Sequence, residues 1–203
     1  MDTSGAETPS IAYKVFTFEE SKNARQESLC VSIPELGAGV SLPGVVASRC
    51  GAKVILSDST RNPLCLENCR RSCEVNGLHD VDVLGLTWGE ISPDLVLLPK
   101  LDVILGSDVF YEPQDFEDVI VTVAFLLRKN PRAQFWTTYQ QRSADWSMEA
   151  LLHRWNMNCV EVRLETFAAD KAELAGSSLP GSHSIDMMII TLKSGEDEQR
   201  HII

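Results

Sequence analysis

Residues 35–39 read Glu-Leu-Gly-Ala-Gly, and the fold of the chain is decided around this short stretch. It ends an apolar run at 29–36 and precedes a helical pattern in which Pro43 takes a first-turn position. Glycines between a strand and a helix let the backbone turn tightly and approach a ligand that side chains would block. Two glycines alone are weak evidence, because any loop from a strand to a helix can use them.

Apolar runs of strand length continue along the chain and alternate with longer helical patterns. The runs are 29–36, 53–57, 81–86, 101–107, 133–139, 159–164 and 185–192. Most are rich in Val, Ile and Leu and barely alternate, which is typical of strands covered on both faces. The last two runs have no helix between them, which indicates one antiparallel strand. The order predicts an α/β fold with an open, mostly parallel, Rossmann-like sheet and helices on both faces.

Three helical patterns are the clearest. One covers 61–76, one begins at Pro113, and one covers 145–155 with Ser143 as its expected N-cap. We see no internal repeat and no second domain. The expected organisation is a loose or atypical segment at 1–28, one domain at 29–193 and a polar tail at 194–203.

The composition bounds the function. The 203 residues are 44% apolar and 23% charged, a balance typical of one globular domain. The net charge of −11 argues against a broad phosphate-binding surface and suits a basic partner, although it also suits plain solubility. The first ten residues lack the pattern of a signal peptide, and no apolar stretch is long enough to span a membrane. We therefore expect a cytoplasmic or nuclear protein with reduced thiols.

Asp58 ends the second apolar run and lies at the expected tip of the second strand. A carboxylate there can accept hydrogen bonds from both hydroxyls of a ribose, or it can cap the helix that follows. The glycine loop lacks the third glycine of a dinucleotide fingerprint, and the chain has no Gly-Lys-Ser/Thr for a triphosphate. Without a pyrophosphate to hold, adenosine attached to an amino acid fits better than NAD. S-adenosyl-L-methionine is the common ligand of that description.

The ends of the third and fourth runs carry further candidates. Trp88 follows the third run, where its indole can pack on an adenine or on the core. Asp108 and Tyr111 follow the fourth run. Ligands of open α/β sheets bind beyond the carboxyl ends of the strands, so this acid and phenol are expected to face the reacting methyl group. The alternative is an aspartate that caps the Pro113 helix.

Several stretches together resemble a known family. Residues 36–44 read Leu-Gly-Ala-Gly-Val-Ser-Leu-Pro-Gly, residues 86–89 Leu-Thr-Trp-Gly, and residues 107–113 Ser-Asp-Val-Phe-Tyr-Glu-Pro. They resemble the family-16 seven-β-strand protein methyltransferases, and the resemblance covers about 35–193. It implies the seven-strand S-adenosylmethionine-dependent methyltransferase fold, S-adenosyl-L-methionine as donor and S-adenosyl-L-homocysteine as product. It also implies methylation of basic protein side chains, with histone arginine favoured and lysine the target of most relatives.

The resemblance assigns site residues by position. The cofactor-binding set is Glu35, Gly37, Gly39, Asp58, Trp88 and Ser107. In the family these positions serve the methionine part (the glycines), the ribose (the aspartate) and the adenine side (the indole and the serine). Asp108 and Tyr111 match the Asp-x-x-Tyr motif beside the substrate and are the expected catalytic pair. The implied partners are a basic protein such as a histone, and chaperones, without a metal, a nucleic acid or a membrane.

One departure from the family concerns the amino-terminal part. The family carries a Trp-Pro-containing helical segment before the first strand, and residues 10–30 contain no such pair. Pro34 also falls inside the first expected strand, where it cannot donate to a sheet ladder. The chain is then a shortened or diverged variant. This leaves two alternatives to a protein methyltransferase: a weak or inactive variant that binds proteins, and a small-molecule methyltransferase on the same fold.

The cysteines and histidines suggest no other chemistry. Cys65, Cys69 and Cys73 recur every four residues on one helical face, but their spacing is not that of a zinc module. We expect them to be small buried hydrophobes. The histidines form no pattern with a nucleophile, so hydrolase chemistry has no support.

Overall fold

The computed structural model describes residues 31–140, 147–167 and 185–193. The strands are β1 (Ser32–Glu35), β2 (Lys53–Asp58), β3 (Asp82–Gly85), β4 (Val103–Ser107), β5 (Gln134–Gln140), β6 (Met157–Val162) and β7 (Ile185–Leu192). The α-helices are α1 (Leu42–Arg49), α2 (Pro63–Val75), α3 (Pro93–Leu97), α4 (Phe116–Lys129) and α5 (Met148–Arg154). Short 3₁₀ turns lie at Pro113–Asp115 and Leu164–Phe167.

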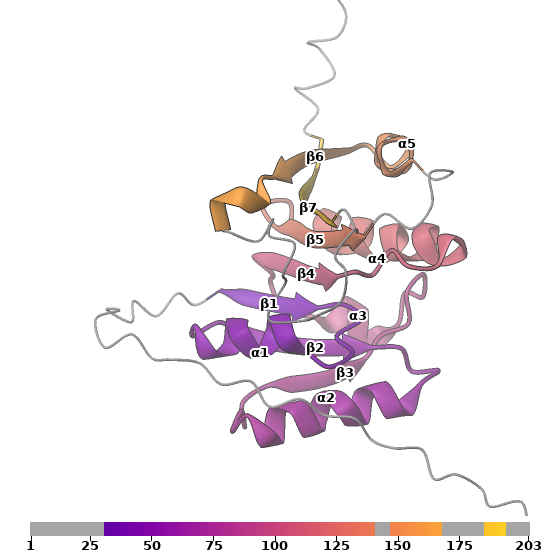
Figure 1. Cartoon of the computed structure of the whole chain (residues 1–203). Helices are drawn as coiled ribbons and strands as arrows, with labels where there is room; N and C mark the ends of the chain where they lie inside the picture. The colour runs from indigo at the N-terminus through magenta and orange to yellow at the C-terminus, as the bar shows by residue number, and fades with distance from the viewer. Residues whose placement is uncertain (1–30, 141–146, 168–184, 194–203) are drawn as a thin grey trace, which may run out of the picture.

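The seven strands form a single sheet in the order β3-β2-β1-β4-β5-β7-β6, which Figure 1 shows as a stack with β6 at one end and β3 at the other. Strands β1 to β5 are parallel, and β7 runs antiparallel between β5 and β6. The predicted seven-strand, mostly parallel α/β fold is therefore confirmed. The chain order reverses between β1 and β4, and ligands of open α/β sheets bind in the crevice at such a switch point.

Helices cover both faces of the sheet, because side chains of successive strand residues point to opposite faces. On β2, Val54 and Leu56 belong to a small apolar cluster with Cys69 and Cys73 of α2. Ile55, between them, belongs to the larger cluster that includes most of α4. Cys69 and Cys73 are buried, which confirms their expected role as small core residues, whereas Cys65 is only partly buried. Among the residues described, no helix is both long enough and apolar enough to cross a membrane.

Strand β1 contains Pro34 and nevertheless stays in register. It pairs continuously with β2, and Pro34 lies opposite Ile55. Toward β4, the bonds on either side of the proline are intact: Asp102 N–H donates to Ser32 O (3.1 Å) and Leu36 N–H donates to Leu105 O (2.8 Å). The proline thus removes one donor on the β4 side. No bulge interrupts the pairing with β2, and the strand is shorter than the predicted 29–36.

The start of α5 differs from the prediction. Ser147 is its N-cap, and the Ser147 hydroxyl accepts a hydrogen bond from Ala150 N–H (3.1 Å). The expected cap at Ser143 lies outside the described residues, and the helix begins later than predicted. Both serines stand just before the same apolar pattern, so the sequence alone does not separate them. The expected segments at 1–28 and 194–203 also lie outside the described residues.

Candidate active site

The loop from β1 to α1 lies at the carboxyl end of the sheet, and its two glycines have different neighbours. Gly37 and Gly39 both have positive φ, 60° and 53°. A Cβ atom at Gly37 would lie 2.6 Å from Cζ2 of Trp88, so this glycine lets the indole pack against the loop. Among the described residues, a Cβ atom at Gly39 would have no heavy atom within 4 Å. Gly39 is therefore the glycine that faces open space, where a ligand can approach the backbone.

Asp58 fastens this loop to the tip of β2. Gly39 N–H donates to Asp58 Oδ2 (2.9 Å), and Ser59 N–H donates to Asp58 Oδ1 (2.7 Å). The two bonds fix the plane of the carboxylate, and each oxygen keeps a lone pair for another donor. The structure thus brings the predicted acid and the predicted glycine into direct contact, 19 residues apart in the chain.

Glu35 lies beneath the same loop rather than at its surface. Its side chain is 1% exposed, and Oε2 accepts a hydrogen bond from Gly44 N–H (2.9 Å) in the first turn of α1. Burial raises the pKa of Glu35 to about 8; the hydrogen bond from Gly44 opposes this rise, and the charge of Asp58 adds to it. Glu35 therefore holds the loop and the start of α1 together from below.

Helix α2 supports the loop from the other side, through residues whose role the sequence did not reveal. The Cys69 thiol donates to Gly39 O (3.7 Å), and the Ser72 hydroxyl donates to Val40 O (3.1 Å). Burial raises the pKa of Cys69 to about 11, so the thiol stays protonated and remains a donor. The four-residue spacing of the cysteines indicated one helical face, but it did not indicate that this face contacts the glycine loop.

A small hollow of about 140 Å³ opens beside Asp58. The described residues that line it are Asp58, Ser59, Arg61, Thr87, Trp88, Tyr111, Asp115 and Asp118. Trp88 and Tyr111 meet edge to face, with their ring centroids 6.2 Å apart. Burial, followed by the charges of Asp115 and Asp58, raises the pKa of Tyr111, so its phenol stays neutral and can donate a hydrogen bond. Three of the predicted residues thus share this hollow.

The last two predicted residues lie at the end of β4. Asp108 has a φ of 55°, and its N–H donates to Thr138 O (3.0 Å) on β5. The Ser107 and Thr138 hydroxyls lie 3.3 Å apart. Ser107 lines a second hollow of about 140 Å³, together with Trp136 and Met187. The structure therefore places Ser107 and Trp88 in different hollows.

These features fit a nucleoside linked to an amino acid. The glycine that faces open space lets a ligand approach the backbone, the fixed carboxylate offers acceptors for hydroxyl groups, and the indole and phenol offer apolar surface. Within the described part of the chain, no group of three or more His, Cys, Asp or Glu side chains is arranged to hold a metal ion.

Comparison with known proteins agrees with this arrangement. The profile of a family described as lysine methyltransferase matches residues 8–151. The histone-arginine methyltransferase METTL23 of Xenopus laevis is 66% identical over 158 residues, which are 78% of this chain and 68% of that protein. The Mus musculus protein of the same name is 59% identical over 160 residues, which are 79% of this chain and 63% of that protein. The chain thus spans about two thirds of the length of these relatives.

A solved structure shares the fold. The TehB-like S-adenosylmethionine-dependent methyltransferase of Corynebacterium glutamicum superposes with a TM-score of 0.56 at 14% identity, over 80% of each chain. At that identity the likeness concerns the fold alone. The shared fold agrees with the family profile, with the similar proteins and with the arrangement of the glycine loop and Asp58. The chain belongs to the family-16 lysine methyltransferases, a family of S-adenosylmethionine-dependent protein methyltransferases.

Proposed function

We propose that this chain transfers a methyl group from S-adenosylmethionine to a basic side chain of a protein, with histones as the substrate class and arginine as the favoured residue. The observation that carries the proposal is the bond from Gly39 N–H to Asp58 Oδ2 (2.9 Å), next to a glycine with open space before it. An anchored carboxylate beside an accessible backbone is what a ribose and an amino-acid moiety need.

On the cofactor side, the chain's own residues bind and orient. Asp58 accepts from the ribose hydroxyls, and Gly39 allows close approach of the methionine part. Trp88 offers one edge of its indole to the adenine, and its other contacts hold it against Gly37 and Tyr111. Glu35 is a positioning residue, because its carboxyl contacts the loop and α1 rather than the hollow.

On the substrate side, Asp108 and Tyr111 position the nucleophile. When bound, S-adenosylmethionine would supply a methyl group on a positively charged sulfur, and Asp108 and Tyr111 would align the side-chain nitrogen with that methyl group. A carboxylate such as Asp108 binds the guanidinium fork of arginine and localises its charge. The neutral phenol of Tyr111 donates a hydrogen bond that fixes the orientation of the nucleophile.

Arginine and lysine place different demands on this site. A lysine amine must lose its proton before it attacks, and a dry pocket favours that loss by disfavouring the charged form. Tyr111 is 47% exposed, and Asp108 is only partly buried, so the substrate side is open to water in this structure. This openness, together with the names of the relatives, supports arginine. A histone substrate would place the activity in the nucleus or the cytoplasm.

Two measurements test the proposal. Titration calorimetry with S-adenosylmethionine should show saturable binding, and incubation with methyl-labelled cofactor and purified core histones should transfer label to protein. Hydrolysis of the labelled protein to amino acids, followed by their separation, distinguishes methylarginine from methyllysine. Asp108→Asn should retain cofactor binding and lose transfer. Binding of S-adenosylmethionine without methyl transfer to any protein would mean that the chain is a binding module. No binding of S-adenosylmethionine at all would contradict the proposed cofactor site.

A further inference from the structure

A second concave surface lies on the far side of β5 from the glycine loop. It is a groove of about 490 Å³ between α5 and the ribbon formed by β6 and β7. We call it the ribbon groove. The proposed methyl-transfer chemistry uses none of the described residues that line it.

The apolar lining of the ribbon groove is rich in methionine. Met148, Leu152, Met157 and Met188 contribute to it, so three of the five methionines of the chain line one groove. Methionine side chains are unbranched and polarizable, and surfaces built from them adapt to partners of different shape. Such a lining suits binding to several polypeptide segments that differ in their side chains.

The rim of the groove is acidic. Among the described residues of the lining, Glu149, Glu161 and Asp186 are acidic, and Lys193 is the one lysine or arginine. Among the residues that the structure describes, none of the three carboxylates forms an ion pair. Glu149 and Glu161 are exposed, and Asp186 is partly buried. The groove therefore offers unsatisfied negative charge around an apolar lining, which is complementary to a basic segment of polypeptide.

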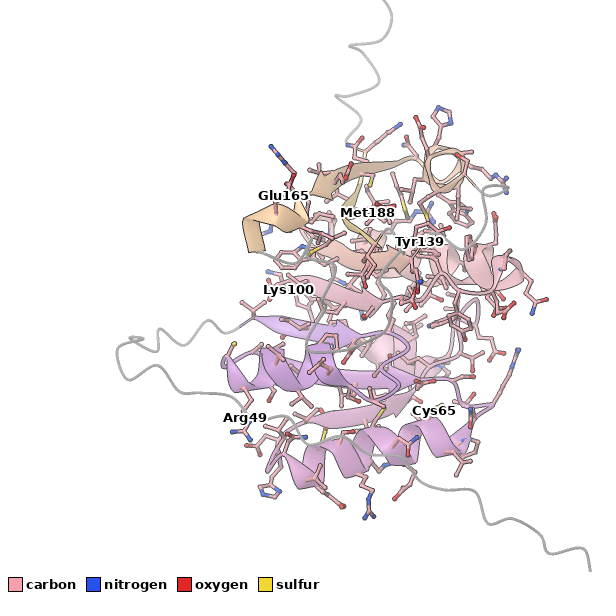
Figure 2. All side chains as sticks on the ribbon, in the orientation of Figure 1. Arg49, Cys65, Lys100, Tyr139, Glu165 and Met188 are labelled. Atoms are coloured by element: carbon pink, nitrogen blue, oxygen red, sulfur yellow. The ribbon has the colours of Figure 1, made fainter. Side chains whose placement is uncertain are left out.

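One end of the groove reaches the edge of the sheet where the reaction is proposed to occur. Asp186 lies opposite Tyr139 on β5, and the preceding residue of β5, Thr138, accepts the hydrogen bond from Asp108 N–H. Asp108 and Asp186 are thus two strand spacings apart, about 10 Å between backbones. From Asp186 the groove follows β7 to Lys193, a distance of about 24 Å for extended chain. Figure 2 labels Met188 and Tyr139 in this part of the molecule.

We propose that the ribbon groove binds a basic segment of the protein substrate, next to the residue that is methylated. Lysine or arginine heads of that segment pair with Glu149, Glu161 and Asp186, while their aliphatic stems and the residues between them pack on the methionines. This proposal rests on the proposed function, and it adds a docking site that sets substrate affinity without contacting the methyl group. The groove accommodates about seven extended residues.

The experiment measures binding and transfer separately, with purified core histones as the probe. Glu161→Lys should raise the Kd for histones, measured by fluorescence anisotropy, and the KM for methylation roughly fivefold or more, with kcat and the Kd for S-adenosylmethionine unchanged. The difference in histone Kd between Glu161→Lys and the parent should become smaller in 0.5 M salt, because salt screens the interaction between exposed charges. Lysine is well tolerated on an edge strand, so the variant should fold.

Two variants serve as matched controls. Glu74→Lys makes the same change in charge on the exposed side of α2, and Val160→Lys adds a cation to the neighbouring residue of β6, whose side chain is 62% exposed on the opposite face. Both should bind histones nearly as the parent does. An equal loss in Glu74→Lys would overturn the proposal by showing that net charge alone matters, and an unchanged Kd in Glu161→Lys would overturn it directly. Histone binding that depends on Glu161 without any methyl transfer would contradict the proposed function and leave the docking site standing.

Discussion

The glycine loop after β1 and the ribbon groove at β6 and β7 differ in how their side chains are used. At the glycine loop, most polar side chains have backbone partners: Asp58 accepts from two N–H groups, Glu35 accepts from one, and Cys69 donates to a carbonyl. At the ribbon groove, carboxylates surround flexible methionines, and no ion pair holds them among the described residues. A loop fixed by several hydrogen bonds suits a ligand of constant shape, and a surface whose carboxylates form no ion pairs suits ligands that differ in shape. If the two proposals hold, the comparison teaches that one sheet can carry specificity for the methyl donor near its centre and tolerance toward the protein substrate near one end.

The largest effect is expected from Gly39→Val. Its Cβ would meet no atom of the described residues within 4 Å, so the substitution fills the space where the ligand is proposed to bind and also strains a backbone with φ of 53°. We expect S-adenosylmethionine binding to fall more than about a hundredfold in calorimetric titration, because both effects act on the ligand site. Gly77→Val is the matched control, since Gly77 has φ of 65° and equally open surroundings at the end of α2. Equal loss of binding in both variants would show that strain alone matters.

Asp58→Ala should have the next largest effect. It removes the acceptor for the ribose and frees two backbone N–H groups, and the loss of a charged hydrogen bond costs about 1.5–3 kcal/mol in binding free energy. The Kd for S-adenosylmethionine should rise about ten- to a hundredfold. Asp102→Ala is the control, because Asp102 accepts from Ser32 N–H (3.0 Å) at the opposite edge of the sheet. An unchanged Kd in Asp58→Ala would remove this carboxylate from the site.

A pH series tests whether the loop end depends on its buried acid. The pKa of Glu35 is raised from 4.5 to about 8, so the folded chain holds a proton there that the unfolded chain releases above about pH 4.5. The contribution to stability is full below that pH and is lost as the pH rises toward 8, by up to about 1.4 kcal/mol per pH unit. Urea unfolding at pH 5.5, 7 and 8.5 should show this slope in the parent and a flatter profile in Glu35→Gln. Parallel pH profiles of the parent and Glu35→Gln would mean that Glu35 is ionised in the folded chain. Glu74→Gln is the control for a change in net charge, because Glu74 is exposed.

The smallest effect is expected at Pro34. Replacement by Val restores a donor toward β4, worth about 0.5–1.5 kcal/mol, and loosens the unfolded chain by a similar amount, so the free energy of unfolding should change by less than about 1 kcal/mol. Because β1 already pairs in register with β2, the Kd for S-adenosylmethionine should stay within about twofold of the parent. A tenfold gain in affinity would show that the proline does limit the site.

Much of this architecture is predictable because it depends on local patterns. The seven apolar runs became seven strands, and the acid at the tip of β2 met the glycine loop because parallel strands end at a common edge. The exact contacts were less accessible. Nothing in the sequence indicates that Glu35 turns under the loop to reach Gly44, or that Cys69 donates to Gly39 O. The cap of α5 was placed at the wrong serine, since two serines precede the same pattern. Such details depend on which side chain fills which space, and that is settled only when the helices pack.

The backbone conformation of Asp108 limits which residue types this position can accept during evolution. With φ of 55°, the residue sits in the left-handed region, where most L-residues are strained and only Gly, Asn and Asp are comfortable. Glutamate would keep the charge but not the backbone, and asparagine would keep the backbone but not the charge. Relatives that keep both the backbone conformation and the negative charge should therefore all carry aspartate here. A relative that carries Gly or Asn at this position should keep the shape of the loop but lack the charge that the proposed methyl transfer uses.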